Sequence, residues 1–368
     1  METDTGEINV ISLGTDRLLW QPGSKIRRRL EVIAEPLGSY SVFVMSKAFK
    51  TKPMARVGKL KIRDFPVLSP FTFFSFLAFV ARAKVRGPVI LTAQDPFFCG
   101  FLVALAAHIC HMPYELQLHT DPYSPMFQTG TVRRKLELAI ANFLLPRAPI
   151  VRVVSKRVEE ALYARGISHT YHLPVYTELD ARPRDSKDFE YEFTFLSVGR
   201  FESEKKFDLL ISAFQEAQEE MPNAGLVLEG DGSQAAFLRS LVKPNDRIQF
   251  YPWEMDVVPY YQSADVYVLS SMFEGYAMAP LEAAANGCAV VMTDVGMAGE
   301  VLKHEESALV VPPGDKEALK NAMLRIYKDN ELRSKLKENA KAVTQNLASL
   351  SQVREAQIQA WQKVLALH

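Results

Sequence analysis

Cysteines are few in this chain, its net charge is zero, and no secretory signal is recognisable at its start. The three cysteines, Cys99, Cys110 and Cys288, are too few for a disulfide framework and indicate a reducing compartment. The uncharged stretch at residues 68–80 has 13 residues, whereas a helix needs about 20 apolar residues to cross a bilayer. The first ten residues, METDTGEINV, lack the apolar region of a secretory signal. We therefore expect a cytoplasmic protein.

The composition is that of a folded protein with more than one domain. Hydrophobic residues make up 48% of the chain and charged residues 23%, which excludes an extended disordered protein. A length of 368 residues exceeds what one core usually fills and predicts two domains. Residues 1–185 carry 25 Lys and Arg against 16 Asp and Glu, so the N-terminal half is basic. These basic residues are not interleaved with aromatic ones, so no nucleic-acid partner is expected.

Short apolar runs alternate with helical patterns in both halves, which is typical of α/β units around parallel sheets. In the first half, strands are predicted at residues 8–13, 41–45, 88–93, 114–119 and 150–155. In the second half they are predicted at residues 193–199, 225–230, 247–252, 265–270, 288–293 and 308–313. The polar segment 177–192 between the two sets has the composition of an interdomain linker. The expected fold class is α/β, with two doubly wound, Rossmann-like domains.

Two basic residues follow the first strand of the second half. Arg200 and Lys205 stand in GRFESEKK, where the strand turns into a helix, and ligands of open parallel sheets bind at such strand ends. A guanidinium and an ammonium group directed into one cleft suit a diphosphate. Either residue alone is more often an ordinary surface charge, but their shared position favours the binding role.

Glycine and acidic residues follow the next strands. The Gly-Asp-Gly turn at residues 230–232 is weak evidence alone, because such turns are common. Glu274 and Glu282 stand on either side of a Gly-Tyr-Ala turn, and Pro280 predicts a helix that begins after it. A helix N-terminus offers free N–H groups to a phosphate, and Glu282 beside it can bind a ribose. The simpler interpretation is a carboxylate favoured by the helix dipole.

The ordered set of these motifs resembles a known family of enzymes. The motifs lie in FLSVGRFESEKKFDLLISAF, LEGDGS and SADVYVLSSMFEGYAMAPLEAAANGCAVVMTDVGMAGEVL, between residues 195 and 302. In this order they are similar to the donor-binding domain of the retaining GT-B glycosyltransferases of family 4, the glycosyl transferases group 1. The resemblance implies two Rossmann-like domains facing a cleft, with an acceptor-binding domain at 1–180 and a nucleotide-sugar-binding domain at 181–345. It also implies a C-terminal helix, 346–368, that packs back on the N-terminal domain.

The resemblance implies a role for each matching residue. Arg200 and Lys205 match the basic pair that holds the donor diphosphate and stabilises the leaving group. Glu274 matches the first glutamate of the family motif, near the donor sugar, and Glu282 matches the second, which binds the ribose. Ala277 stands where many relatives have a second glycine. The other residues expected to bind the nucleotide sugar are Gly199, Gly230, Asp231, Gly232, Gly275, Tyr276, Met278, Leu281 and, at the nucleobase, Trp253.

In the N-terminal half the match rests on LHTDPYSPMF. His119, at the end of a strand, resembles the family's histidine that faces the sugar, and the alternative is a structural histidine. Asp121 matches the aspartate of that segment only with Thr120 interposed. Gly14 lies where the family has a glycine-rich loop, and Gly14 and Asp121 are expected on the acceptor side. A metal site is not expected, because no Asp-x-Asp pair occurs and the histidines at 108 and 111 lie in an apolar helical context.

The predicted function is metal-independent, retaining transfer of a sugar from a UDP- or GDP-linked donor to an acceptor hydroxyl. No cofactor is expected, since Arg200 and Lys205 would hold the diphosphate that a metal holds elsewhere. The alternatives are another GT-B activity, a phosphorylase or an epimerase, and a non-catalytic nucleotide-sugar-binding partner of another transferase.

The acceptor is expected to be a glycan or a lipid-linked glycan, because the N-terminal half is basic and partly apolar. Residues 68–80 are interpreted first as a helix buried in a domain core. The alternative is a peripheral contact with the anionic inner face of a membrane. The basic residues that would flank this contact are Lys25, Arg27, Arg28, Arg29, Arg82, Lys84 and Arg86.

Overall fold

The computed structural model describes residues 8–47, 54–69, 71–85, 87–128, 131–183 and 187–368 of the chain. These residues form two compact units. The first comprises Met1–Tyr176 together with Ala348–His368, and the second comprises Thr177–Leu347. Residues 1–7 and Arg86, both used in the sequence predictions, lie outside the described residues.

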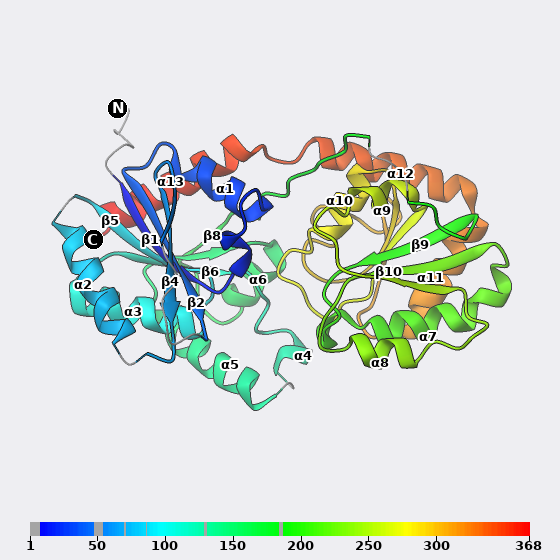
Figure 1. Ribbon diagram of the computed structural model, residues 1–368, viewed down its shortest axis with the longest axis horizontal. Helices are drawn as coiled ribbons and strands as arrows, with labels where there is room; N and C mark the ends of the chain where they lie inside the picture. Colours follow the sequence, from blue (N-terminus) through cyan, green and yellow to red (C-terminus); the bar gives the residue numbers. More distant parts are fainter. Residues whose placement is uncertain (1–7, 48–53, 70, 86, 129–130, 184–186) are drawn as a thin grey trace. The chain divides into compact units, whose positions relative to one another are not determined.

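The first unit is built on an eight-stranded sheet (Figure 1). Its strands are β1 (Asn9–Gly14), β2 (Ser39–Ser46), β3 (Ala55–Val57), β4 (Leu60–Pro66), β5 (Val89–Ala93), β6 (Tyr114–Leu118), β7 (Val151–Val153) and β8 (Thr170–His172). The strand order is β3-β4-β2-β1-β5-β6-β7-β8, and the strands from β4 to β8 pair in parallel. The order reverses between β1 and β5, so the carboxyl ends of these strands form a topological switch point.

Helices cover both faces of this sheet. One face is covered by α2 (Thr72–Lys84), α3 (Phe98–Cys110), α5 (Val132–Leu144) and α6 (Lys156–Tyr163). The other face is covered by α1 (Lys25–Ala34) and α13 (Leu350–Ala366). The sheet therefore has a hydrophobic core on each face. Because successive side chains of a strand point to opposite faces, Ile11 and Leu13 of β1 belong to the first core and Val10 belongs to the second. The shorter elements are η2 (Arg17–Trp20), α4 (Pro125–Gln128) and η3 (Leu145–Arg147).

The C-terminal helix α13 belongs to the first unit, as predicted. It begins with a capping box, in which the side chains of Ser349 and Gln352 each accept a hydrogen bond from the other residue's backbone N–H. Trp361 is 1% exposed, and its ring meets that of Tyr40 edge to face, with 5.9 Å between the ring centroids. The helix is therefore an integral part of the first core rather than an appendage.

The second unit is built on a six-stranded parallel sheet of order β11-β10-β9-β12-β13-β14. Its strands are β9 (Phe193–Val198), β10 (Ala224–Glu229), β11 (Ile248–Tyr251), β12 (Val266–Leu269), β13 (Ala289–Thr293) and β14 (Leu309–Val311). The order reverses between β9 and β12, which form the switch point of this unit. The predicted fold class, α/β with two Rossmann-like units and a returning C-terminal helix, is thus confirmed.

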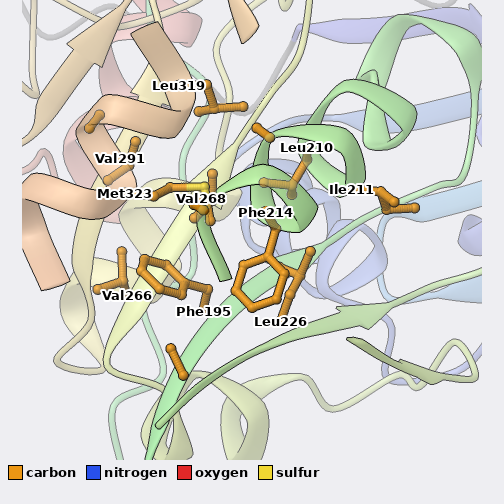
Figure 2. Packing of buried hydrophobic residues seen from close by; sticks show 14 of the residues in the cluster. Phe195, Leu210, Ile211, Phe214, Leu226, Val266, Val268, Val291, Leu319 and Met323 are labelled. Carbon is orange, nitrogen blue, oxygen red and sulfur yellow. The ribbon is translucent and has the colours of Figure 1, made fainter. Parts of the chain in front are cut away.

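The core of the second unit lies between its sheet and two long helices (Figure 2). Phe195 of β9 and Val268 of β12 pack against Phe214, Leu319 and Met323 of the helices, and all five side chains are fully buried. The helices of this unit are α7 (Phe207–Ala217), α8 (Ala235–Ser240), α9 (Val258–Ser263), α10 (Ala279–Ala285), α11 (Lys316–Lys328) and α12 (Asn330–Gln345). The short elements are η4 (Ser203–Lys205) and η5 (Gln218–Glu220).

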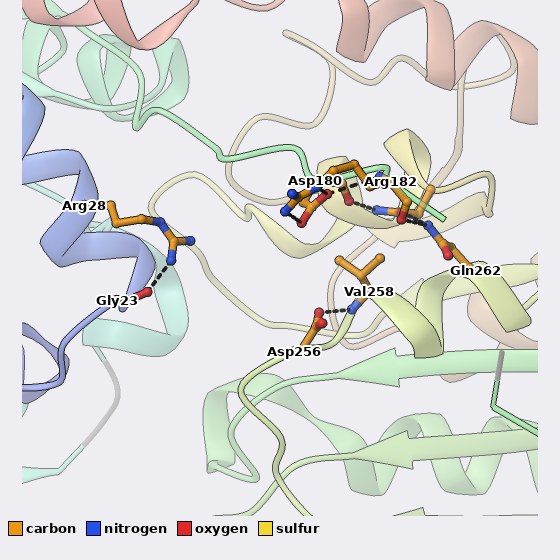
Figure 3. A network of polar contacts seen from close by, with 8 residues as sticks. Gly23, Arg28, Asp180, Arg182, Asp256, Val258 and Gln262 are labelled. Carbon is orange, nitrogen blue, oxygen red and sulfur yellow. Dashed lines mark hydrogen bonds and ion pairs between the residues drawn. The ribbon is translucent and has the colours of Figure 1, made fainter. Parts of the chain in front are cut away.

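The segment that the sequence indicates as a linker is attached to the second unit (Figure 3). Arg182 donates two hydrogen bonds, of 2.9 and 2.8 Å, to the carboxylate of Asp180. Gln262 of α9 donates to the Arg182 carbonyl at 2.9 Å, and Asn286 donates to the Asp180 carbonyl at 3.0 Å. The second unit therefore begins before Asp180, at Thr177.

Each predicted strand is present, but three further strands were not predicted. β3 and β8 contain three residues each, too few for a clear pattern. β4 contains Lys61, Arg63 and Asp64, whose charges interrupt the apolar pattern although the strand is largely buried. Residues 68–80 were predicted to form a helix buried in a domain core, and the structure buries only one side of α2. Phe76 of α2 is buried against the sheet, but Phe74 is 68% exposed, because a helix in an outer layer buries one side alone.

The basic residues of α1 do not flank this exposed helix, contrary to the sequence prediction. α1 packs on the face of the sheet opposite α2. Arg27 is buried, and Arg29 is drawn inward so that burial lowers its pKa to about 10. Arg28 is exposed but donates to the Gly23 carbonyl just before its own helix (Figure 3). These side chains serve the first unit's own structure.

Candidate functional site

Three loops of the second unit leave the same edge of its sheet. They span residues 199–206, 230–234 and 270–278 and follow β9, β10 and β12. These three strands are parallel neighbours, with β9 in the middle. The candidate residues on the loops therefore lie together at the switch point, where parallel sheets bind ligands.

The first two loops are tied to each other through glycines. Phe201 N donates to the Asp231 carbonyl at 2.9 Å. Gly230 has a φ of 150°, and a Cβ at this position would lie 1.9 Å from the Gly199 carbonyl oxygen. A residue with a side chain cannot replace Gly230 without separating the loops. The carboxylate of Asp231 accepts a hydrogen bond from Gly232 N at 2.8 Å and is exposed to solvent.

An ion pair joins the first loop to the third. Lys205 Nζ lies 2.6 Å from Glu274 Oε1, and the two side chains are 21% and 15% exposed. Ser271 Oγ donates to the same carboxylate oxygen at 2.7 Å. The pair is therefore held in a defined place while solvent still reaches it.

Arg200 does not take part in this ion pair. Its side chain is 72% exposed, and its Nη2 lies 3.6 Å from Glu204 Oε1. An exposed pair of this kind contributes about 0–1 kcal/mol to stability. The guanidinium group is thus held weakly and can turn toward an anion at the strand ends.

Buried hydroxyl groups hold these loops, and the sequence prediction missed them. Ser270 Oγ donates to the Lys205 carbonyl at 2.8 Å, and Thr293 Oγ1 donates to the Ser271 carbonyl at 2.7 Å. Ser270, Ser271 and Thr293 are all buried. The signal that could have identified them is their position directly at a strand end, because a buried hydroxyl group needs a hydrogen-bond partner.

The turn between Glu274 and Glu282 has a strained backbone. Ala277, at the position of the family's second glycine, has a left-handed φ of 69°. A Cβ on Gly296 would lie 2.5 Å from the Tyr276 carbonyl oxygen, to which Met297 N donates at 3.0 Å. Gly296 is therefore a further residue that shapes this turn, and it was not among the predicted ones.

Glu282 lies in the first turn of α10, and Tyr261 donates to its Oε2 at 3.3 Å. Burial, Glu274 and Glu282 together raise the pKa of Tyr267, a buried residue of β12. The Tyr267 hydroxyl group is therefore close enough to interact electrostatically with both Glu274 and Glu282. Both glutamates thus lie near the end of β12. Of the other candidates on this turn, Met278 is 42% exposed, whereas Gly275, Tyr276 and Leu281 are buried.

Trp253 is exposed on a loop that a buried carboxyl group holds. Its side chain is 49% exposed. Glu229, the last residue of β10, is fully buried, and its Oε1 accepts a hydrogen bond from Glu254 N at 2.6 Å. Burial raises the pKa of Glu229 to about 7, although the Glu254 N–H opposes this rise. The residue next to Trp253 is thus anchored to a group that changes its charge near neutral pH.

His119 directly follows β6 in the first unit and is half-buried. Its Nε2 lies 3.0 Å from Gln117 Oε1. Burial, Arg152 and Arg29 lower the pKa of His119 to about 3. The imidazole is therefore neutral at physiological pH, and it can form hydrogen bonds with a hydroxyl group but does not act as a cation.

In the first unit, Gly14 is the last residue of β1, and Asp121 lies in the turn after β6. A Cβ on Gly14 would lie 1.9 Å from Gln94 Oε1, so this glycine leaves room for the Gln94 side chain at the end of β5. Asp121 Oδ1 accepts a hydrogen bond from Tyr123 N at 2.9 Å and shapes the turn after β6. Asp121 thus stabilises the turn in which it lies. Gln94, which was not predicted, lies beside Gly14.

The described part of the chain contains neither a cluster of metal-ligating side chains nor a membrane-spanning helix. Within these residues, no three His, Cys, Asp or Glu side chains are grouped as metal ligands would be. None of the described helices combines the length and the apolar character of a membrane span.

Comparisons with known proteins agree on one family of sequences. The model of the glycosyl transferases group 1 matches residues 180–343, which contain all the candidate residues of the second unit. The uncharacterized glycosyltransferase MJ1607 of Methanocaldococcus jannaschii is 31% identical over 310 residues, 75% of this chain and 77% of that protein. The lipopolysaccharide core biosynthesis glycosyltransferase LpsE of Rhizobium meliloti is 32% identical over 167 residues. That match covers 45% of this chain and 48% of LpsE, about half its length.

A solved structure shares the fold. HepE from Anabaena, solved in complex with UDP-glucose, matches with a TM-score of 0.75. The match covers 96% of this chain and 99% of HepE at 17% sequence identity. Because the identity is low, this likeness concerns the fold alone.

Proposed function

Because the chain belongs to the glycosyl transferases group 1 family, we propose that it is a retaining, metal-independent enzyme that transfers a sugar from a UDP- or GDP-linked donor. The chain is a glycosyltransferase with the GT-B type of fold. We propose in addition that it belongs to family 4 of these enzymes.

The ion pair of Lys205 and Glu274 is the observation that supports this proposal most directly. Its two groups come from different loops and meet at 2.6 Å over the strand ends. When a donor binds, the Lys205 ammonium can exchange the carboxylate for diphosphate oxygens, and Glu274 can then accept hydrogen bonds from sugar hydroxyls. Arg200 is weakly held and can turn toward the same anion.

In the proposed reaction the acceptor oxygen attacks the anomeric carbon from the face that the diphosphate leaves. The bond between the anomeric carbon and the phosphate oxygen breaks with its electron pair on the diphosphate, while the bond to the acceptor oxygen forms. The proton of the acceptor hydroxyl passes to the departing phosphate oxygen. Lys205 and Arg200 stabilise the negative charge on that diphosphate, which is the task a metal ion performs in other transferases.

A thermal-shift panel tests the donor site. UDP, GDP and ADP, with their common sugar conjugates, are added with and without EDTA. We expect one diphosphate to raise the melting temperature equally in both conditions. UDP is the first nucleotide to try, because HepE was solved with UDP-glucose. No shift with any nucleotide, or a shift that EDTA abolishes, contradicts the proposal.

Turnover by variants tests the roles of the ion pair. Lys205→Ala and Glu274→Ala are each expected to lower transfer about a hundredfold. Lys205 stabilises the charge that develops on the leaving diphosphate, and Glu274 holds the transferred sugar in place through its hydroxyl groups. Lys243→Ala, at an exposed position away from the three loops, is the control. Near-normal turnover in either site variant refutes its role. A product whose formation depends on inorganic phosphate points to the phosphorylase alternative, and inversion at the anomeric carbon excludes retention.

We further propose that the acceptor is a lipid-linked glycan and that the first unit contacts an anionic membrane. Phe71, Phe74, Ala78, Ala81 and Val85 are exposed along α2 at spacings of three and four residues. Phe71 is 74% and Phe74 68% exposed. These positions form a continuous apolar stripe on the side of the helix that faces away from the sheet.

The neighbouring helices extend this apolar surface. α3 contacts both α2 and α5. The large apolar side chains exposed on α3 and α5 are Phe98, Phe101, Ile109, Val132, Leu136 and Phe143. The three helices contain five basic residues and one acidic residue, Glu137. Apolar side chains combined with a positive charge are the chemistry that binds an anionic lipid leaflet.

A cavity beside α2 suits the lipid end of such an acceptor. Its volume is about 630 Å³, and Phe71, Phe76 and Phe79 line it together with Arg63 and Asp64 of β4. The Arg63 guanidinium carbon lies 4.6 Å from the centroid of the Phe79 ring. Aromatic walls next to a cationic group fit an apolar chain that carries a phosphate.

A further inference from the structure

A line of hydrogen bonds inside the first unit ends at His119. Glu115, Gln117 and His119 occupy alternate positions, so their side chains point to the same face of the sheet. Gln117 Nε2 lies 2.7 Å from Glu115 Oε1, and Gln117 Oε1 lies 3.0 Å from His119 Nε2. Glu115 is 0% and Gln117 7% exposed. The line therefore connects a buried carboxyl group to the candidate sugar-facing histidine.

The donor and the acceptor of each hydrogen bond can be assigned by starting at Arg152, at the end of the line opposite His119. Arg152 can only donate, and its Nη1 donates to Gln357 Oε1 of α13 at 2.8 Å. The Gln357 amide nitrogen is thereby turned toward Tyr171 Oη, at 2.8 Å, and Glu115 Oε2, at 3.3 Å. Tyr171 in turn donates to Glu115 Oε2 at 2.5 Å.

Glu115 consequently accepts hydrogen bonds on both of its oxygens. Tyr171 and Gln357 donate to Oε2, and the amide nitrogen of Gln117 donates to Oε1. Burial raises the pKa of Glu115, but Tyr171 and Arg152 oppose the rise and favour the carboxylate. Because the Gln117 nitrogen is committed to this carboxylate, its oxygen is left to face His119.

An amide oxygen can only accept, so the ring nitrogen that faces it, Nε2 of His119, must carry the proton. Burial and two nearby arginines lower the pKa of His119 to about 3, so the ring carries a single proton at neutral pH. Nδ1 then keeps its lone pair. It can accept a hydrogen bond and cannot donate one.

We propose that Gln117 and Glu115 are positioning residues, which hold His119 in its Nε2–H tautomer so that Nδ1 accepts a hydrogen bond from a sugar hydroxyl. This role rests on the proposed function and on the family resemblance, which implies that His119 faces the transferred sugar. α13 takes part as well, because its Gln357 supplies the amide that orients the far end of the line. When Nδ1 is always the acceptor, it binds only a hydroxyl group that points toward it. A ring that rotates freely and exists as both tautomers does not select a hydroxyl group by its direction.

The tautomer is measured first on the full chain, labelled with 15N-histidine, by two-bond 1H–15N correlation without substrate. His119→Asn identifies the His119 signal among the seven histidines. We expect His119 to be protonated at Nε2 alone. An Nδ1–H tautomer overturns the proposal. Since this measurement needs no turnover, its outcome is separate from that of the thermal-shift panel, which tests the proposed function.

Substitutions along the line then test the cause. Gln117→Met keeps the length of the side chain but removes the amide, and we expect both tautomers and a fall in kcat of about two- to tenfold. The KM for the donor and the thermal shift by the nucleotide should change little. Glu115→Gln lets the Gln117 amide turn over and should also give both tautomers.

Tyr171→Phe is the matched control. It removes a hydrogen bond to the same carboxylate but leaves the Glu115 oxygen that orients Gln117, so the wild-type tautomer should persist. Gln117→Met with the wild-type tautomer and the wild-type kcat contradicts the proposal. If Gln117→Met does not fold, the test uses the wild type and Glu115→Gln. Nε2–H alone in the wild type and both tautomers in Glu115→Gln support the proposal, and the wild-type tautomer in Glu115→Gln contradicts it.

Discussion

Glu229 lies at the end of β10, directly before the Gly-Asp-Gly turn, and its side chain is fully buried. Within the described residues, its Oε2 is buried without a hydrogen-bond partner. Lys205 and Glu274, by contrast, are paired and remain reachable from solvent. The sequence predicts the Lys205–Glu274 site but not the buried Glu229. Motif order predicts Lys205 and Glu274, whereas the burial of Glu229 depends on strands packed on both of its sides.

The pKa of Glu229 predicts a pH-dependent stability. The folded-state pKa, about 7, lies above the ordinary value for glutamate, so the folded state holds this proton more tightly. Its ionisation costs stability progressively as the pH rises from about 4.5 to 7, and the cost is constant above that range. Glu229→Gln removes the charge and should stabilise the protein at pH 8 by about 1–3 kcal/mol, with little difference at pH 5.

Melting temperatures of the wild type and Glu229→Gln between pH 5 and 8 measure this effect. Glu338→Gln, an exposed position on α12, should retain the wild-type dependence on pH. Identical slopes for Glu229→Gln and the wild type would show that the buried carboxyl group is not the cause.

At the scale of an element, α2 shows that composition does not determine which side of a helix is buried. Residues 68–80 carry no charge, which predicted a buried core helix. The structure buries Phe76 and Val80 against the sheet and leaves Phe71 and Phe74 in solvent. A helix that covers one face of a sheet has an outer side, and here that side remained apolar. The turn at Ala277 is a second example. Ala277 has a left-handed φ, and Gly296, which is distant in sequence, lies close against this turn. The sequence around Ala277 does not predict this contact.

The exposed side of α2 predicts binding to anionic membranes. At low salt, the protein should sediment with phosphatidylglycerol liposomes and much less with phosphatidylcholine liposomes. The double variant Phe71→Ser and Phe74→Ser should weaken this binding by about tenfold or more, because two aromatic side chains no longer enter the lipid. Phe237→Ser, a 49% exposed residue of α8, is the control. A wild-type protein that stays in solution with anionic liposomes would contradict the membrane contact.

At the scale of the whole molecule, the two units do not share a core and are joined by a chain that passes between them twice. The first unit is completed only by its last helix, α13, which follows the entire second unit in sequence. The amphipathic spacing of α13 predicts a helix, and the family resemblance predicted where it packs. The buried contact of Trp361 with Tyr40 is what attaches it there.

Removal of the Trp361 side chain should therefore destabilise one unit and not the other. We expect Trp361→Ala to cost the first unit about 3–5 kcal/mol, the usual effect of deleting a buried tryptophan. Hydrogen–deuterium exchange should accelerate in β1, β2 and β5, whereas β9 and β12 should exchange as before. Leu367→Ala, at a 76% exposed position, is the control. Equal acceleration in both units would mean that they do not fold as independent cores.

By itself the sequence determined where most of the strands lie, although not β3, β4 and β8, and which strand ends carry Arg200, Lys205, Glu274 and Glu282. These features are local, since apolar periodicity and motif order are read within one stretch of chain. The tertiary structure decided which side of α2 meets water, how the Glu229 carboxyl group is buried and which nitrogen of His119 carries a proton. These features depend on contacts between distant segments, such as that of Gln357 with Glu115, 242 residues apart, and no local pattern encodes such a contact.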